Sequence, residues 1–111
     1  MITKMQYTLT TDNTEQIAYI ERLLQEKVVP TLNRYLPELE DEVAKADIVV
    51  KKRSRWGFSA TFDMRLPEKY HIYADAKEKA IRDTLIQLRN KVKQQLMDYK
   101  DEVTRKRLRE E

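Results

Sequence analysis

The sequence contains no cysteine and only one glycine among its 111 residues. Without cysteine the chain can form no disulfide, thiolate zinc site or thiol nucleophile. A single glycine excludes a glycine-rich phosphate loop, which needs several positions where the backbone approaches phosphate closely. No apolar run approaches the roughly 20 residues that cross a bilayer, and no charged-then-apolar leader opens the chain. We therefore expect neither a membrane-spanning segment nor secretion.

Charged residues are abundant and unevenly distributed along the chain. They make up 37% of the sequence, against 41% hydrophobic residues, which is enough for the core of one small domain. Residues 1–44 carry 4 basic and 8 acidic side chains, whereas residues 45–109 carry 18 basic and 9 acidic ones. The net charge of +3 therefore hides a strongly basic second part. Such a part attracts polyanions, although a solvated ionic surface is the alternative interpretation.

The beginning of the chain predicts a strand followed by a helix. Residues 5–9 alternate between apolar and polar side chains, as in a half-buried strand. Asp12 and Glu15 have the spacing of a capping box that begins a helix. Pro30 has no N–H, so it is expected to kink or end this helix, with a short continuation through residues 32–36. The apolar positions of the helix are Ile17, Ile20, Leu24 and Val28.

The middle of the chain predicts three further strands. Residues 45–52 have a β-branched centre, and residues 56–66 alternate strictly between apolar and polar side chains. Tyr70 begins a fourth strand with the same alternation. The segment 38–42, Glu-Leu-Glu-Asp-Glu, is interpreted as a solvated acidic turn.

A long helix is predicted for residues 76–103. Asp75 and Glu78 have capping-box spacing at its start. At 1.5 Å per residue the helix would span roughly 42 Å, so its end is expected to project beyond the sheet. The apolar positions recur at helical spacing: Ile81, Leu85, Leu88, Val92, Leu96, Tyr99 and Val103.

The predicted elements follow the order β-α-β-β-β-α, which indicates an α+β fold. The most economical architecture is a four-stranded sheet with two helices packed on one face. We expect a single domain over residues 1–103 and a basic C-terminal tail over residues 104–111.

Basic residues form a line along the last predicted helix. At about 100° per residue they fall within roughly 20° of one line, about a quarter turn from the apolar stripe. A row of cations on a rigid helix can follow a phosphate backbone and displace its counterions. The alternative is a solvated helix flank with ion pairs between residues four apart. The residues are Arg82, Arg89, Lys93 and Lys100.

A second basic cluster lies at the predicted hairpin between the second and third strands. Its residues are candidates for RNA contact, and the alternative is that they protect a strand from pairing with other chains. Trp56 beside the cluster could stack on a base, but the unbroken alternation favours a core position. The cluster consists of Lys51, Lys52, Arg53 and Arg55.

No catalytic or metal-binding set is recognisable in the sequence. His71 has no second His or Cys at ligand spacing. The carboxylates of residues 38–42 have no nucleophile beside them. We therefore expect no enzymatic activity, no metal, no cofactor and no small-molecule substrate.

The order of elements and several short motifs resemble a known family. Residues 15–36 form a first helical stretch that ends in Arg-Tyr-Leu. The stretch 66–100 contains the motifs Tyr-Ala-Asp-Ala at 73–76, Lys-Val at 91–92, Gln-Leu at 95–96 and Tyr-Lys at 99–100. Together they resemble the short form of the ribosome hibernation family, which includes hibernation-promoting factor, the ribosome-associated inhibitor and the sigma-54 modulation proteins.

The resemblance implies a cytoplasmic bacterial protein of stress or stationary phase that binds the small ribosomal subunit. In the family this domain occupies the channel used by mRNA and tRNA anticodon ends, and it blocks translation by occupancy. Lys91 and Lys100 match basic positions of the family's long helix. We expect a monomer that contacts ribosomal RNA. The alternatives are a protein–protein interaction module that uses the long last helix and a generic duplex-RNA-binding domain.

Overall fold

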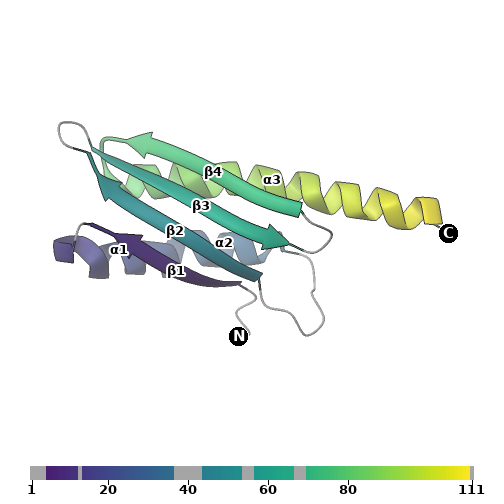
Figure 1. Ribbon diagram of the computed structural model, residues 1–111, viewed down its shortest axis with the longest axis horizontal. Coiled ribbons are helices and arrows are strands. Elements are labelled where there is room, and N and C mark those ends of the chain that lie inside the picture. Colours follow the sequence, from purple (N-terminus) through teal and green to yellow (C-terminus); the bar gives the residue numbers. More distant parts are fainter. Residues whose placement is uncertain (1–4, 13, 37–43, 54–56, 67–69, 111) are drawn as a thin grey trace.

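The structure consists of one sheet with a layer of helices on one of its faces (Figure 1). The computed structural model describes residues 5–12, 14–36, 44–53, 57–66 and 70–110, except for the side chains of 14, 44, 103, 104 and 106–110. The strands are β1 (Met5–Thr11), β2 (Ala44–Lys52), β3 (Phe58–Leu66) and β4 (Tyr70–Glu78). The helical elements are η1 (Thr14–Gln16), α1 (Ile17–Leu23), the π-helical turn η2 (Leu24–Val28), α2 (Val29–Asn33) and α3 (Ile81–Glu110).

The strands lie in the sheet in sequence order, so β1 and β4 form its two edges. β1 and β2 are parallel, and the helical residues 17–33 connect them as a crossover. β2, β3 and β4 pair antiparallel. This arrangement confirms the predicted α+β fold, a four-stranded sheet with two helical segments on one face.

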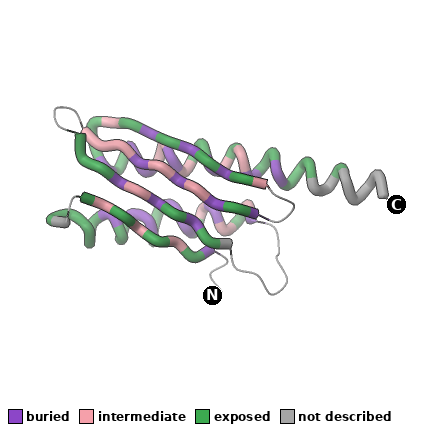
Figure 2. The backbone as a smooth tube through the Cα atoms, viewed as in Figure 1, coloured by how far each residue is buried: buried purple, intermediate pink, exposed green. Residues whose placement is uncertain are grey.

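The core lies between the sheet and the helices (Figure 2). Residues 17–33, called here the first helical segment, lie behind β1 and β2, while α3 packs on β3 and β4 (Figure 1). Alternate strand residues point into the core, and the others form the open face of the sheet. Burial of each large core side chain contributes about 1.5–3 kcal/mol. Fully buried examples are Ile20, Leu24, Ile48, Phe62, Ile72, Leu88 and Leu96.

Pro30 bends the hydrogen-bonding pattern of the first helical segment without ending it. The π-helical turn η2 ends at Val28, two residues before the proline, and α2 continues to Asn33. A proline has no N–H and its ring crowds the carbonyl one turn earlier, which the wider π turn accommodates. The predicted continuation beyond the proline is confirmed as far as Asn33, whereas residues 34–36 form a turn and a bend. Leu32 and Leu36 are both buried, as their spacing predicted.

The capping box predicted at the first helix is wrong. α1 begins at Ile17, and Gln16 makes no side-chain capping bond. The Asp12 carboxylate instead accepts a hydrogen bond from the backbone N–H of Lys52 at 3.1 Å. Asp12 therefore ties the end of β1 to the end of β2, a tertiary contact that local spacing does not reveal.

The capping box predicted at the last helix is wrong as well. Asp75 and Glu78 belong to β4, because the strand keeps pairing with β3 up to Glu78. α3 begins three residues later, at Ile81. The Thr84 hydroxyl donates to the Ala80 carbonyl at 2.8 Å in the first turn. Cross-strand pairing thus overrides the local helix-start signal.

The single glycine joins the β2–β3 hairpin to the end of β4. Gly57 has a φ of 66°, in the left-handed region that favours glycine. A Cβ at this position would lie 2.1 Å from the carbonyl oxygen of Glu78. The N–H of Arg53 donates to the Gly57 carbonyl at 3.0 Å and closes the hairpin. β3 then begins at Phe58, while Arg55, Trp56 and the acidic segment 38–42 lie outside the described residues.

α3 is longer than predicted and passes the end of the sheet (Figure 1). Its 30 residues span about 45 Å in a molecule 54 Å long. Tyr99 is the last buried side chain among those described, and Val103 lies outside them. Residues 104–110 continue the helix, where a separate tail was expected. No described helix is both long and apolar enough to cross a membrane.

Candidate nucleic-acid interface

The cations of the predicted stripe lie on the flank of α3 that faces the first helical segment. Arg89 Nη1 donates to the carbonyl oxygen of Lys27 at 3.3 Å. Lys93 Nζ lies 5.2 Å from the ring centroid of Tyr35, just after α2. The other two members of the stripe are exposed on the same line of α3, at about 100° per residue. We call the four residues the seam cations: Arg82, Arg89, Lys93 and Lys100.

The π-helical turn contributes to the position of Arg89. The Lys27 carbonyl lies within this turn and also accepts a hydrogen bond from the Thr31 hydroxyl at 3.3 Å. Arg89 reaches the same carbonyl from α3, and its Nε and Nη2 bond to Asn90 Oδ1 at 3.2 and 3.1 Å. The guanidinium is therefore held between two helices before any ligand binds.

The partners of Arg89 and Lys93 leave the positive charge of these two side chains uncancelled. Arg89 bonds to a carbonyl and an amide, and Lys93 lies over an aromatic ring. In the described part of the chain, Arg82 has no ion pair with a carboxylate. Among the described residues these three side chains form no ion pair four residues apart, while a solvated helix flank stays the alternative interpretation. Their charges remain available to attract an anion.

Two further cations of the helical layer were missed in the sequence. Lys27 and Arg34 are exposed on and just after the first helical segment. They are seven residues apart, about two helical turns, and this spacing predicts that they lie on the same face of a helix. Because Pro30 was expected to interrupt the helix between them, the spacing was not used. Both residues add positive charge to the layer that carries the seam cations.

Lys91 lies on the opposite flank of α3 from the seam cations. It is 2 residues from Arg89, so the two side chains leave the helix roughly 160° apart. Lys91 Nζ donates to the carbonyl oxygen of Asp75, on the edge strand β4, at 2.7 Å. The structure therefore places Lys91 against the sheet edge and apart from the seam.

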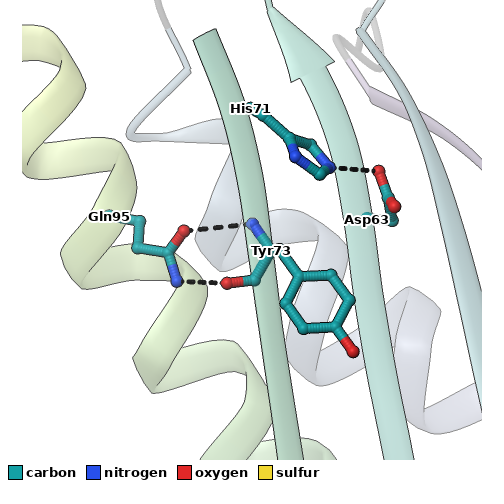
Figure 3. A network of polar contacts seen from close by, with 4 residues as sticks. All are labelled: Asp63, His71, Tyr73 and Gln95. Carbon is teal, nitrogen blue, oxygen red and sulfur yellow. Dashed lines mark hydrogen bonds and ion pairs between the residues drawn. The ribbon is translucent and has the colours of Figure 1, made fainter.

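The same flank of α3 holds β4 through two glutamines. Gln95 accepts from the Tyr73 N–H at 3.1 Å and donates to the Tyr73 carbonyl at 2.5 Å (Figure 3). Gln87 Nε2 donates to the Glu78 carboxylate at 2.9 Å. These residues and Lys91 recur every four positions and form what we call the edge-binding flank: Gln87, Lys91 and Gln95.

The hairpin cations lie at the end of the sheet where α3 begins. Lys51, Lys52 and Arg53 are exposed there, and the close approach of Gly57 to Glu78 brings the hairpin to the start of the helix. The sequence placed this cluster and Arg82 in separate patches. The structure brings them to one end of the molecule, which lengthens the basic surface beyond the seam.

The open face of the sheet has an acidic centre. Asp47 on β2 lies opposite Asp63 on β3 in the strand register. Asp63 Oδ1 lies 2.7 Å from His71 Nε2, and Tyr73 is half exposed beside them (Figure 3). Asp75 adds a third exposed or half-exposed carboxylate on the same face. These carboxylates share the open face with the exposed cations Lys45, Lys51, Arg65 and Lys77, so positive and negative charges alternate there. The helical layer is the better candidate for nucleic acid because its seam cations form one line along α3.

One tyrosine at the far end of β4 is electrostatically perturbed. Burial raises the pKa of Tyr70, and the nearby carboxylates of Glu102 and Asp98 raise it further. The Tyr70 ring packs on Tyr99, with centroids 4.6 Å apart. Tyr70 therefore stays neutral and acts as a packing residue. Among the described residues no group of His, Asp and Glu side chains is arranged to hold a metal ion.

Comparison with known proteins supports the architecture. No protein-family model matches the chain, and no curated protein matches its sequence. Among solved structures, the chain is similar to the Protein Y N-terminal domain of Thermus thermophilus, with a TM-score of 0.59. The similarity covers 86% of this chain and 98% of that domain, at 15% sequence identity. At this level of identity the similarity establishes a common fold.

Proposed function

We propose that this protein binds the small ribosomal subunit through the seam cations. The bound domain occupies the channel used by mRNA and tRNA anticodon ends, and it blocks translation as a monomer, without chemistry. Folded RNA is recognised largely through its shape and through phosphate and sugar contacts, which distributed Lys and Arg side chains supply.

Three lines of argument support this proposal, and one of them carries it. The N-terminal domain of Thermus thermophilus Protein Y has the same fold. The motifs of the second half resemble the ribosome hibernation family. The decisive observation is that Arg89 and Lys93 are held on one flank of α3 by groups that leave their charge uncancelled.

Charge reversal at the seam tests the proposal. The variant Arg89→Glu, Lys93→Glu, Lys100→Glu should lose at least about 100-fold in affinity for ribosomes, because three phosphate contacts become repulsive. Co-sedimentation with small subunits over a series of salt concentrations measures the affinity and its salt slope. Thermal unfolding followed by circular dichroism checks that the variant is folded.

A matched control separates position from total charge. Lys45, Arg65 and Lys77 are exposed cations of the strands, with side chains on the open face. Their reversal to Glu changes the net charge by the same amount and should reduce affinity far less than the seam variant. Equal losses in the two variants would mean that only net charge matters, and the assignment of the interface to the seam would be wrong.

The projecting end of α3 favours a second candidate function. The helix continues past the sheet to Glu110, and a free helical end can pair with a helix of another protein. Partner capture that survives ribonuclease treatment would support this protein–protein module. Equal binding to naked duplex RNA and to ribosomes would instead indicate a generic duplex-RNA binder.

A further inference from the structure

The two edge strands of the sheet differ in whether other parts of the chain bond to their outward backbone groups. At β4, the backbone groups of Tyr73 and Asp75 bond to side chains of the edge-binding flank. At β1, no strand pairs with the outer edge in the part of the chain that the structure describes. An open edge presents a row of N–H and C=O groups that can pair with another strand.

The register identifies which residues of β1 face outward. The backbone N–H and C=O groups of Tyr73 point toward α3, away from β3. The backbone N–H and C=O groups of its register partner Asp63 therefore point toward β2. Asp47 lies opposite Asp63 and faces β3, and successive residues alternate. The next residue, Ile48, therefore faces β1.

The parallel pairing completes this assignment. Ile48 has Leu9 as its register partner, so it bonds to the flanking residues Thr8 and Thr10. The Lys52 N–H, which has the same orientation as Ile48, bonds to Asp12 just after β1 and agrees with this alternation. The residues of β1 whose N–H and C=O groups face outward are then Met5, Tyr7, Leu9 and Thr11, and the first three supply the outward groups considered below.

Composition makes this edge suitable for pairing with a copy of itself. β1 is Met-Gln-Tyr-Thr-Leu-Thr-Thr, with no charge and no proline. Charges, prolines or bulges usually prevent the edge strands of native sheets from pairing with other chains. β4 carries His71, Asp75 and Lys77, and the edge-binding flank of α3 also bonds to its backbone. Two uncharged strands can approach each other without opposing like charges.

We propose that two copies of this protein pair antiparallel through β1 to form a continuous eight-stranded sheet. With Tyr7 opposite Tyr7 of the second copy, Met5 lies opposite Leu9 of the second copy on either side of the two-fold axis. The outward groups then form six backbone hydrogen bonds. On the open face, Gln6 lies opposite Thr8 of the second copy, and both side chains are exposed and uncharged.

This pairing goes beyond the proposed ribosome binding and uses a different surface. The seam cations lie between α3 and the first helical segment, away from the β1 edge. The two copies carry the same net charge of +3, so they repel each other weakly at low salt. Dimerisation should therefore strengthen as salt rises, whereas RNA binding should weaken. The bound form at the ribosome remains the monomer.

Paired charge substitutions test the register directly. Sedimentation equilibrium of the purified chain should show a concentration-dependent dimer. The variant Gln6→Lys, Thr8→Lys places Lys opposite Lys twice and should weaken the dimer by about tenfold. The matched variant Gln6→Lys, Thr8→Glu places Lys opposite Glu twice and should restore or strengthen it. A wild-type protein that stays monomeric up to about 1 mM, or two variants with equal effects, would overturn the proposal.

Hydrogen exchange tests the edge without substitution. The amides of Met5, Tyr7 and Leu9 should exchange rapidly in dilute protein and become protected as concentration rises. The amides of Thr8 and Thr10, which bond to β2, should be protected at both concentrations. Protection of the outward amides that does not change with concentration would contradict self-pairing. Ribosome co-sedimentation of the Lys/Lys variant should match the wild type, so failure of either proposal can be recognised separately.

Discussion

The two flanks of α3 carry similar polar side chains but put them to different uses. On one flank, Arg89 and Lys93 meet a carbonyl and an aromatic ring of the first helical segment and keep their charge. On the other flank, Lys91 and Gln95 bond to the backbone of β4. A lysine on this helix is therefore a ligand candidate or a structural residue according to the surface that it faces.

The difference follows from what each neighbouring element needs. An edge strand has unpaired N–H and C=O groups, and a neighbouring helix can satisfy them with side-chain amides and ammonium groups. The first helical segment has satisfied most of its backbone groups internally, so cations beside it find few strong partners. Uncancelled charge thus gathers at the seam between helices, while polar contacts at the sheet edge stabilise the fold.

Both flanks depend on where α3 begins, which Gly57 helps to fix. The change Gly57→Ala should reduce the free energy of unfolding by about 2–4 kcal/mol, because the new Cβ meets the Glu78 backbone and the left-handed φ is strained. Chemical denaturation measures this loss. The control Ser59→Ala, on the open face of β3, should change stability by less than about 0.5 kcal/mol. Equal stability of the two variants would show that the hairpin does not constrain the helix.

Removal of Gln95 should expose the structural role of the edge-binding flank. Gln95→Ala loses both bonds to Tyr73 and should cost about 1–2 kcal/mol, since water replaces part of the interaction. Hydrogen exchange at the Tyr73 amide should accelerate. Gln94 is the matched control, because its exposed side-chain amide bonds to Asp98 on the same helix. If Gln94→Ala has the same effect, the bond to β4 does not stabilise the edge.

A neutral substitution on each flank separates the two roles of lysine. Lys93→Met should weaken ribosome binding by about tenfold and lower the salt slope by about one, as expected for one lost phosphate contact. Lys91→Met should leave the salt slope unchanged and reduce stability by about 1 kcal/mol, because the Asp75 carbonyl loses its donor. Co-sedimentation and denaturation measure the two quantities. A larger binding loss at Lys91 would reverse the functional assignment of the flanks.

Periodicity in the sequence was sufficient to predict the architecture. The alternation in residues 56–66 placed one face of β3 in the core, and Phe62 and Met64 are buried as expected. The recurrence of apolar side chains every three or four residues from Ile81 to Tyr99 placed α3 against the sheet. Both signals come from side chains whose burial follows directly from local geometry. The line of the seam cations was predictable for the same reason.

Tertiary contacts explain what the sequence could not give. Asp12 matched a helix cap, yet its carboxylate serves a strand 40 positions away in the chain. Lys91 matched a family position, yet the edge of β4 binds it. Local spacing contains no information about which backbone groups remain unpaired after the sheet forms. Local spacing therefore could not show that the two capping boxes do not form, or that the hairpin lies at the same end of the molecule as the start of α3.

The flank of α3 that faces β4 becomes acidic near the start of that strand, where burial and the carboxylates of Glu102 and Asp98 raise the pKa of Tyr70. Because its pKa is raised in the folded state, its contribution to stability is fully present below the ordinary value of about 10 and is lost as pH rises through the folded value. Glu102→Gln removes the second cause of the shift, so the pKa of Tyr70 should fall while remaining above the ordinary value through burial. Ultraviolet titration, with Tyr70→Phe to identify the signal, measures the change.

Asp101 supplies the matched control. It is exposed, lies next to Glu102 on α3 and is not a cause of the shift, so Asp101→Asn should leave the titration of Tyr70 unchanged. Equal shifts in both variants would mean that Tyr70 senses overall charge, and that the two flanks of α3 do not differ electrostatically at this end.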